Sequence, residues 1–478
     1  MTAETQIIVI GGGGAGLSAA TAAAEMGADV IVLEKRETLG GNSALAEGLF
    51  AVESPAQKRM NIDARRDEAF KIAMSYAHWT LDARLVRALI DKSGDTIHWL
   101  ENKGMYFDWI PPYYHDQPIR TWHCIRGRGI VLVKLLAGIC EGRGVRFFCE
   151  HRVKRLLTDQ KGNVCGVIAV TNGKEVQILA RSVVISTGGY GGNKELLKRY
   201  CPYYTDHLVY RGIPNQGDGL LMATEIGAAT EGLGILQLSG HTSPKLSLHI
   251  NAVTEEPNTV WVNKRGERFI DEAAGFNHFE SVNAVVRQPG RLCYILFDES
   301  IKQNIVENGI IKGVGQIVPP GTRLVDLEQD LQMAAIKDLE WIKIANCWDD
   351  IAAWMGAEPE TLKATISEYN SFCHQGHDLV FAKNAKYLQS LFTPPYYALK
   401  CYPSFLGTIG GIRINYRMEV LDHQYKTIPG LYAAGSDTGG WESDTYNVVL
   451  SGSTLGFAIN SGRIAGENAV RYVSQVER

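Results

Sequence analysis

A run of glycines near the amino terminus has the spacing of a phosphate-binding loop. Gly11, Gly13 and Gly16 fit the pattern G-x-G-x-x-G and directly follow the β-branched run from Ile7 to Ile10. The first glycine permits a tight turn, the second lets the backbone approach a pyrophosphate, and the third lets a helix pack closely. The amino terminus of that helix attracts phosphate groups. The pattern therefore predicts a nucleotide site.

The segments around the loop predict a complete strand-helix-strand unit. Residues 7–10 are typical of a strand that is buried on both faces, residues 17–27 are alanine-rich and favour a helix, and residues 28–33 favour a second strand. Glu34 ends that strand, 18 residues after Gly16. A carboxylate at this place accepts hydrogen bonds from the ribose hydroxyls and repels a 2′-phosphate. We therefore predict a dinucleotide site in a Rossmann-like α/β domain.

Composition and charge argue against several other classes of protein. The 478 residues are 45% hydrophobic with a formal net charge of -4, which suffices for two or three domains with their own cores. Lys and Arg are scattered evenly, so no basic face predicts nucleic-acid binding. No apolar run reaches the roughly 18–20 residues of a membrane span.

Two further observations concern metals and location. The nine cysteines are widely spread without a C-x-x-C pair, so we expect no metal, iron–sulfur or haem site. The chain begins without a basic signal segment, and we expect a cytoplasmic protein.

The segment after Glu34 distinguishes FAD from NAD. Gly40-Gly41-Asn42-Ser43 resembles the FAD signature of the fumarate reductase and succinate dehydrogenase flavoprotein superfamily. Further segments are similar to that family in the same order, namely 182–189, 217–219, 428–435 and 451–466. Members that attach FAD covalently have a histidine where this chain has Asn42. The resemblance therefore implies non-covalent FAD.

The resemblance also implies a fold and a set of cofactor contacts. The expected fold is a Rossmann-like FAD-binding domain, residues 1–235 and 402–478, interrupted by an α+β capping domain at 236–401 that closes over the flavin. The amino terminus of the last helix, at Ser453, would favour the anion of reduced flavin. The implied cofactor contacts are Gly11, Gly13, Gly14, Ala15, Gly16, Glu34, Lys35, Gly41, Asn42, Ser43, Gly48, Val153, Thr187, Gly188, Gly189, Asp218, Gly435, Ser436, Ser451, Ser453 and Leu455.

The chain departs from fumarate reductases at three substrate positions. The proton-donating arginine of their R-F-x-N-E-x-x-x-R stretch corresponds to Phe276, and the arginine of their N-R-L-G-G motif corresponds to Val449. A substrate-binding histidine of the family aligns near Leu406. A dicarboxylate bound here would have buried and unpaired charges, which is strongly unfavourable. Fumarate and succinate are therefore improbable substrates.

Other segments are similar to 3-ketosteroid dehydrogenases. The stretch 405–411, FLGTIGG, resembles their L-G-T-x-G-G motif, and residues 111–114, PPYY, resemble their tyrosine-bearing loop. This resemblance implies a neutral, hydrophobic cyclic, aromatic or steroid-like substrate. The predicted substrate contacts are Tyr113, Phe276, Leu406 and Val449.

The residue that handles the proton stays open among three candidates. The tyrosine of ketosteroid dehydrogenases is absent at Phe276, and their later tyrosine aligns near Val448, two residues from Tyr446. Tyr446 and Tyr114 are therefore candidate phenolic acids, although aromatic residues near a flavin also serve as packing. His241 is the third candidate, because histidine titrates near neutral pH.

These features predict an FAD-dependent oxidoreductase that interconverts CH–CH and C=C next to a carbonyl or conjugated group, in either direction. Its substrate is a small molecule, and its electrons are exchanged with a separate redox protein, a quinone-like molecule or NAD(P)H. One alternative is a flavin-bearing electron-transfer subunit without its own substrate. Another is an amino-acid oxidase similar to L-aspartate oxidase, which also requires arginines where Phe276 and Val449 stand.

Overall fold

The structure is a computed structural model that describes residues 2–114, 116–315, 317–337 and 340–476. Its chain forms two compact units. The first unit consists of Met1–Pro202, Gly212–Gln237 and Gly407–Arg478, and the second of Tyr203–Arg211 and Leu238–Leu406. The assignment of residues 1–235 and 402–478 to a cofactor domain and of 236–401 to a cap concerns function, and it stays a prediction.

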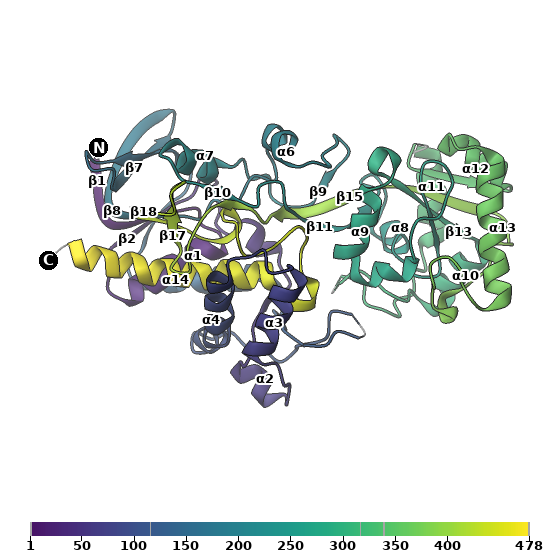
Figure 1. Ribbon diagram of the computed structural model, residues 1–478, viewed down its shortest axis with the longest axis horizontal. Coiled ribbons are helices and arrows are strands. Elements are labelled where there is room, and N and C mark those ends of the chain that lie inside the picture. The colour runs from purple at the N-terminus through teal and green to yellow at the C-terminus, as the bar shows by residue number, and fades with distance from the viewer. Residues whose placement is uncertain (1, 115, 316, 338–339, 477–478) are drawn as a thin grey trace. The chain divides into compact units, whose positions relative to one another are not determined.

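A mostly parallel sheet forms the centre of the first unit (Figure 1). Among the described residues its strand order is β17-β18-β8-β1-β2-β5, and β7 adds to β8 and β6 to β7. Strand β1 pairs in parallel with β2 on one side and with β8 on the other. These strands are β1 (Thr2–Ile10), β2 (Val30–Leu33), β5 (Arg146–Phe148), β6 (Arg152–Thr158), β7 (Val164–Thr171), β8 (Lys174–Ile185), β17 (Glu419–Leu421) and β18 (Thr427–Ala433).

The central position of β1 in the sheet explains the continuous run of β-branched residues at 7–10. Residues 7–10 are all buried, because β1 has a neighbouring strand on both sides and helices α1 and α14 pack against it. The predicted Rossmann-like α/β fold class is confirmed. The observed elements differ from the predicted segments mainly at their ends, where β1 begins at Thr2 and β2 at Val30.

Two long helices pack together in the first unit. Helix α1 (Gly14–Glu25) begins three residues before the predicted segment, and α14 (Ser453–Val476) runs beside it (Figure 1). A side chain at Gly462 would place its Cβ 2.2 Å from the carbonyl oxygen of Ala15. A side chain at Gly466 would likewise approach the carbonyl oxygen of Ala19 to 2.3 Å. Glycine therefore permits the close approach of the two helices.

The remaining elements of the first unit surround this core. They are the helices α2 (Pro55–Arg59), α3 (Arg66–Tyr76), α4 (Ala83–Glu101), α5 (Gly129–Gly142), α6 (Lys194–Tyr200) and α7 (Asp218–Glu225), and the short strands β3 (Gly48–Phe50), β4 (Trp122–Cys124), β10 (Thr230–Glu231) and β16 (Gly411–Ile412).

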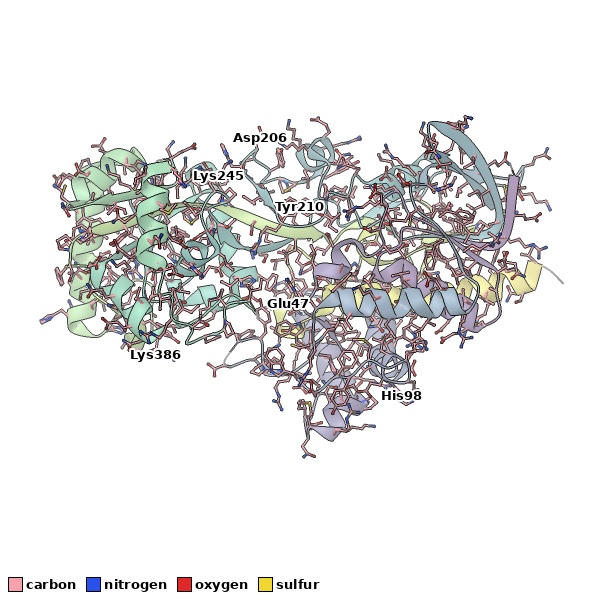
Figure 2. All side chains as sticks on the ribbon, turned by 180° about the vertical axis from the view of Figure 1, so that it is seen from behind. Glu47, His98, Asp206, Tyr210, Lys245 and Lys386 are labelled. Atoms are coloured by element: carbon pink, nitrogen blue, oxygen red, sulfur yellow. The ribbon has the colours of Figure 1, made fainter. Side chains whose placement is uncertain are left out.

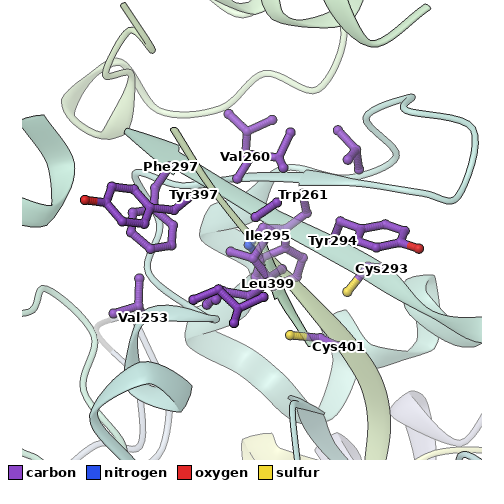
Figure 3. Packing of buried hydrophobic residues seen from close by; sticks show 14 of the residues in the cluster. Val253, Val260, Trp261, Cys293, Tyr294, Ile295, Phe297, Tyr397, Leu399 and Cys401 are labelled. Carbon is purple, nitrogen blue, oxygen red and sulfur yellow. The ribbon is translucent and has the colours of Figure 1, made fainter. Parts of the chain in front are cut away.

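The second unit is built on a largely antiparallel sheet with the order β11-β15-β13-β12, in which β14 and β9 also pair with β15. Its buried core surrounds Trp261, and Phe297 stacks on Tyr397 with a centroid distance of 4.8 Å (Figure 3). The elements are β9 (Val209–Tyr210), β11 (Leu236–Thr242), α8 (Leu248–Val253), β12 (Val260–Val262), α9 (His278–Val286), β13 (Cys293–Asp298), α10 (Glu299–Asn308), α11 (Leu327–Lys337), β14 (Ile342–Ala345), α12 (Trp348–Met355), α13 (Pro359–Gln375) and β15 (Tyr396–Thr408).

Charged side chains such as Lys245 and Lys386 are exposed to solvent (Figure 2). Within the described residues, every helix is too short or too polar to cross a lipid bilayer.

Candidate functional site

The glycine loop between β1 and α1 has a conformation that requires glycine. Gly11 has φ +103°, and a Cβ there would lie 2.3 Å from the carbonyl oxygen of Ser186. A Cβ on Gly16 would lie 1.9 Å from the carbonyl oxygen of Gly11. Both glycines therefore serve the packing of the loop against strand β8 and helix α1, as their spacing predicts.

Gly13 has a different role, because the space beside it is open. A Cβ at Gly13 would meet only the carbonyl oxygen of Gly40, at 3.8 Å. Gly13 is also the N-cap of α1, which has no side-chain cap and no acidic residue in its first turn. A backbone without a side chain at a helix amino terminus fits the pyrophosphate of a dinucleotide. The nearby Ser43 Oγ accepts a hydrogen bond from the Gly14 N–H at 3.1 Å.

Glu34 lies at the end of β2 with 9% of its surface exposed. Its Oε2 accepts a hydrogen bond from the Gly12 N–H at 2.8 Å, and its Oε1 accepts one from the Arg36 N–H at 2.9 Å. A carboxylate has about four acceptor positions. Two of these positions accept the backbone hydrogen bonds that hold the side chain in place. The other acceptor positions remain available for hydrogen bonds from ligand hydroxyls.

These elements surround a pocket whose empty space, including the open solvent at its mouth, is about 810 Å³. The predicted cofactor residues that line it are Gly11, Gly13, Gly14, Ala15, Glu34, Lys35, Gly41, Asn42, Ser43, Val153, Thr187, Gly188, Asp218, Gly435 and Ser436. Further lining residues, which the sequence analysis missed, are Ile10, Leu33, Arg36, His151, Arg152, Ser186, Ile213, Asn215, Ala434 and Ala458.

Asp218 has two cationic partners at the edge of this pocket. Its carboxylate lies 2.7 Å from Lys35 Nζ and 2.7 Å from an Arg152 guanidinium nitrogen. Burial alone would raise the pKa of Asp218, but these two charges outweigh burial and lower it. Two cations on one carboxylate leave a net positive charge, which favours an anionic ligand.

Asp437 organises the loop that follows β8. Its carboxylate accepts hydrogen bonds from the backbone N–H groups of Thr187, Gly188 and Gly189 and from the Thr187 hydroxyl. The residue is 1% exposed, and burial raises its pKa although these donors partly oppose the shift. Sequence analysis missed Asp437. The only local signal is its position after the strand segment IPGLYAAG.

Asn42 lies in the short helix η1 (Gly41–Leu45) and lines the pocket. Its Oδ1 accepts a hydrogen bond from the Ile213 N–H at 2.6 Å. An amide side chain has no nucleophilic atom for a flavin bond, so its chemistry is consistent with a non-covalent cofactor.

Six predicted cofactor residues are placed outside the lining of this pocket. Gly16 packs below the loop, Gly189 binds Asp437, and Gly48 begins β3. The others, Ser451, Ser453 and Leu455, lie just before or in the first turn of α14. Their contact with a flavin stays a prediction.

Gln117 joins the predicted tyrosine loop to the segment before α14. Its Nε2 donates hydrogen bonds to the Val449 carbonyl and to Ser451 Oγ, both at 2.8 Å. Its own backbone N–H donates to the Tyr114 carbonyl at 3.2 Å, and the half-buried Tyr113 ring contacts Trp122. The structure thus brings Tyr113, Tyr114 and Val449 into one region, through a glutamine that sequence analysis missed.

Tyr446 belongs to the same segment and is 3% exposed. Burial raises the pKa of its phenol, while the neighbouring Ser453 hydroxyl and the Gly452 backbone lower it to a smaller degree. A neutral phenol beside a hydroxyl group is able to donate a proton.

His241 is placed in β11 of the second unit, and it is 3% exposed. Its Nε2 donates a hydrogen bond to the Thr254 carbonyl at 2.8 Å, and its ring meets Trp261 edge to face. Burial lowers its pKa, so the imidazole is neutral at pH 7. Its Nδ1 has no hydrogen-bond partner among the described residues.

A largely buried charged cluster lies near His241 in space. Lys312 Nζ pairs with the Glu255 carboxylate, and it lies 3.3 Å from His278 Nδ1. Burial would raise the pKa of Glu255, but the Lys312 charge dominates and lowers it to about 2. Burial and the same ammonium lower the pKa of His278 to about 3. Sequence analysis missed Glu255 and Lys312.

The predicted substrate residues Phe276 and Leu406 are also in the second unit, and both are half-buried. Phe276 lies in the short helix η2 (Glu272–Asn277), and its ring packs on Tyr387 with a centroid distance of 5.6 Å. Val449 of the first unit is half-buried as well. All three present apolar surface.

A parallel α/β sheet with a glycine loop, an acid at the end of its second strand and a cationic pocket edge is typical of a dinucleotide-binding protein. The chain matches a family model described as "FAD binding domain" over residues 6–452, and it belongs to this family of FAD-binding proteins. FAD is its cofactor, and the open position at Gly13 together with the pocket fits this group. The chain is an FAD-dependent oxidoreductase of the fumarate reductase-like superfamily.

Three known proteins illustrate the similarity. A vinyl phenol reductase of Lactiplantibacillus plantarum is 31% identical over 98% of this chain and 97% of that protein. The open conformation of a flavocytochrome c3 fumarate reductase is 28% identical, with a TM-score of 0.75 over 98% of this chain and 79% of that chain. A 3-ketosteroid delta1-dehydrogenase from Sterolibacterium denitrificans shares the fold at 20% identity, with a TM-score of 0.80 over 98% of this chain and 99% of that chain.

Proposed function

We propose that this chain is an FAD-dependent reductase that saturates a C=C bond conjugated with an aromatic ring in a small neutral molecule, of which vinyl phenol is the model. The observation that carries the proposal is the apolar character of Phe276, Leu406 and Val449, which stand where fumarate reductases have two arginines and a histidine. The similarity to a vinyl phenol reductase over nearly both full lengths supports the same substrate class.

The charge balance of the second unit supports a neutral substrate. Lys312 is the ammonium nearest His278 in the described cluster, and Glu255 already neutralises it. His278 itself is uncharged at pH 7, because its pKa is lowered to about 3. A dicarboxylate would therefore compete with Glu255 for the Lys312 ammonium, whereas an aromatic ring gains from apolar contact.

The reaction adds a hydride to one carbon and a proton to its neighbour. Reduced FAD supplies the hydride when it is bound. Tyr446 supplies the proton in this proposal: its O–H bond breaks as a C–H bond forms, and the phenolate remains on the protein. The apolar side chains orient the ring of the substrate and exclude water.

The cofactor is held without a covalent bond in this proposal. The N–H groups at the start of α1 would bind the pyrophosphate, Glu34 would accept hydrogen bonds from the ribose hydroxyls, and Asn42 would contact the flavin. The amino terminus of α14, at Ser453 and Leu455, would stabilise negative charge on the reduced flavin. Electrons come from an external donor in the cytoplasm, which is NAD(P)H, a quinone-like molecule or a redox protein.

Anaerobic stopped-flow mixing tests the substrate class. The photoreduced holoprotein is mixed with vinyl phenol, a 3-ketosteroid enone or fumarate, and flavin reoxidation is followed by absorbance. We expect vinyl phenol to reoxidise the flavin about 100-fold faster than fumarate or buffer. Rapid reoxidation by fumarate would contradict the proposal, and a response to the enone alone would contradict the vinyl arene assignment.

Paired variants test the apolar positions. The double variant F276R/V449R supplies two arginines and should improve fumarate reduction while it weakens vinyl phenol reduction. The matched control F276L/V449L keeps both positions apolar, and fumarate should still fail to reoxidise its reduced flavin.

A further inference from the structure

A second pocket lies in the first unit, and the mechanism above does not use it. It has a volume of about 540 Å³ and lies between α3, α4, α14 and the segment 441–450. Its walls are mainly apolar, and Trp441 stacks on Phe457 with a centroid distance of 4.1 Å. The lining residues with polar groups are Tyr76, Trp441, Glu442, Asn447, Ser453 and Asn460.

Glu442 is a buried acid in the wall of this pocket, with 6% of its surface exposed. Its Oε1 lies within hydrogen-bond distance of Ser453 Oγ, at 3.1 Å, and its Oε2 accepts a hydrogen bond from the Asn447 N–H at 3.3 Å. No salt bridge among the described residues includes Glu442. Burial raises its pKa to about 8, and these two hydrogen bonds lower it only in part. The side chain is therefore a neutral carboxylic acid at pH 7.

Ser453 connects this acid with the predicted proton donor. Its hydroxyl is bonded to Glu442 and also acts on the phenol of Tyr446. The three groups form a chain from the phenol, through a hydroxyl, to a carboxylic acid that borders a pocket. A serine hydroxyl both accepts and donates a proton, so it can pass one along such a chain.

We propose that Glu442, through Ser453, returns to Tyr446 the proton that this tyrosine gives to the substrate, and that the pocket beside Glu442 is the entrance for this proton. The inference rests on the proposed function, because it requires Tyr446 as the donor. The Tyr446 phenolate takes the proton of the Ser453 hydroxyl, and the Ser453 oxygen takes the proton of Glu442. The Glu442 carboxylate then takes a proton from a hydronium ion or a buffer acid that reaches it through the pocket, so the protein returns to its starting charge.

The order of proton affinities favours this direction. The pKa of the Tyr446 phenol is raised above its ordinary value of 10.0, whereas that of Glu442 is about 8. Transfer from Glu442 to the phenolate is therefore downhill. A hydronium ion or a buffer acid restores the proton at neutral pH, because pH 7 lies below the pKa of Glu442.

The residues that line the pocket allow a change of turnover with pH to be assigned to the titration of Glu442. Helix α4 contributes apolar side chains to the pocket, α3 contributes Tyr76, and α14 contributes Ser453 and Asn460. Tyr446, in the same segment, interacts electrostatically with Glu442. Among the described lining residues, Glu442 is the carboxylic acid, and its raised pKa of about 8 lies between pH 5 and pH 9. An alkaline decline of turnover near pH 8 would therefore report on this acid.

The test compares single-turnover and steady-state rates with vinyl phenol as the probe, with chemically reduced flavin mononucleotide as the electron donor, from pH 6 to pH 10. In wild type we expect steady-state turnover to decline above about pH 8. E442Q should keep the single-turnover rate within about twofold, because Tyr446 starts protonated. Its steady-state turnover should fall about 10- to 100-fold and lose the decline near pH 8.

The matched control is D444N, which makes the same carboxylate-to-amide change at an exposed position two residues away. It should behave as wild type. S453A interrupts the chain without changing Glu442, so it provides a second test if E442Q folds poorly, and its steady-state turnover should lose the decline near pH 8.

The outcomes separate the relay from the proposed function. A wild-type pH profile in E442Q and S453A would overturn the relay. Y446F should lose both single-turnover and steady-state rates. Full single-turnover activity in Y446F would instead overturn the assignment of Tyr446 as the proton donor, and the relay with it.

Discussion

Glu255 in the second unit and Glu442 in the first are both buried glutamates, and burial alone would raise the pKa of each. Beside Glu255, the Lys312 ammonium reverses the effect of burial, and the pKa falls to about 2. Glu442 has two hydrogen-bond donors and no ion pair among the described residues, and its pKa is about 8. The presence of a neighbouring cation, rather than burial, decides whether such a side chain is an anion or a protonated, neutral acid at pH 7.

The largest expected effect is the pH dependence of stability at Glu442. The folded protein keeps this proton up to about pH 8, whereas the unfolded chain releases it near the ordinary pKa of 4.5. Stability due to this group is therefore present below pH 4.5 and lost as the pH rises through 8. Across this window the free energy of unfolding of E442Q should rise relative to that of wild type by up to about 1.4 kcal/mol per pH unit. Above the window the difference should stay constant.

Urea unfolding of both proteins at several pH values measures this difference. D444N should follow the wild-type curve. A constant difference between E442Q and wild type from pH 5 to pH 8 would show that Glu442 is ionised in the folded state.

Removal of the cation beside Glu255 should have the next largest effect. K312M leaves a buried carboxylate without its partner and should lower the free energy of unfolding by about 3–5 kcal/mol. The double variant E255Q/K312M removes both charges and should recover most of this loss. Denaturant unfolding at pH 7 measures each step of the cycle. A loss below about 1 kcal/mol in K312M would mean that the pair contributes little.

The smallest effect concerns the titration of His278. Burial and Lys312 lower its pKa to about 3, so its imidazole resonances should not shift between pH 5 and pH 8. In K312M the repelling charge is absent and the Glu255 carboxylate remains, so the pKa should rise. NMR of histidine side chains follows this change, and H278Q assigns the resonance. A wild-type titration midpoint near 6.5 would contradict the electrostatic account of the cluster.

The cofactor half of the site was the more predictable half. The β1 strand, the glycines and Glu34 lie within one short strand-helix-strand unit, and their spacing reflects local geometry. Most of the predicted cofactor residues line one pocket in the structure. The start of helix α14 at Ser453 was likewise predicted, from the resemblance of residues 451–466 to the flavoprotein family.

The residues that the sequence analysis missed have partners far away along the chain. Asp437 binds the backbone at Thr187 across a separation of 250 residues, and Arg152 reaches Asp218 across 66. Gln117 contacts Val449 across 332 residues. A carboxylate or an amide has no periodicity that reveals such a distant partner, so these contacts have no local signature.

The amino-acid sequence alone determined the class of this protein, because the turn at Gly11, the open backbone at Gly13 and the acid at Glu34 follow from short-range steric and hydrogen-bonding requirements. The tertiary structure alone decided which acids are charged. Glu255 and Glu442 are both glutamates, so the residue type alone does not distinguish their protonation states. Their proton affinities differ because folding places an ammonium beside one, and a hydroxyl and an apolar pocket beside the other.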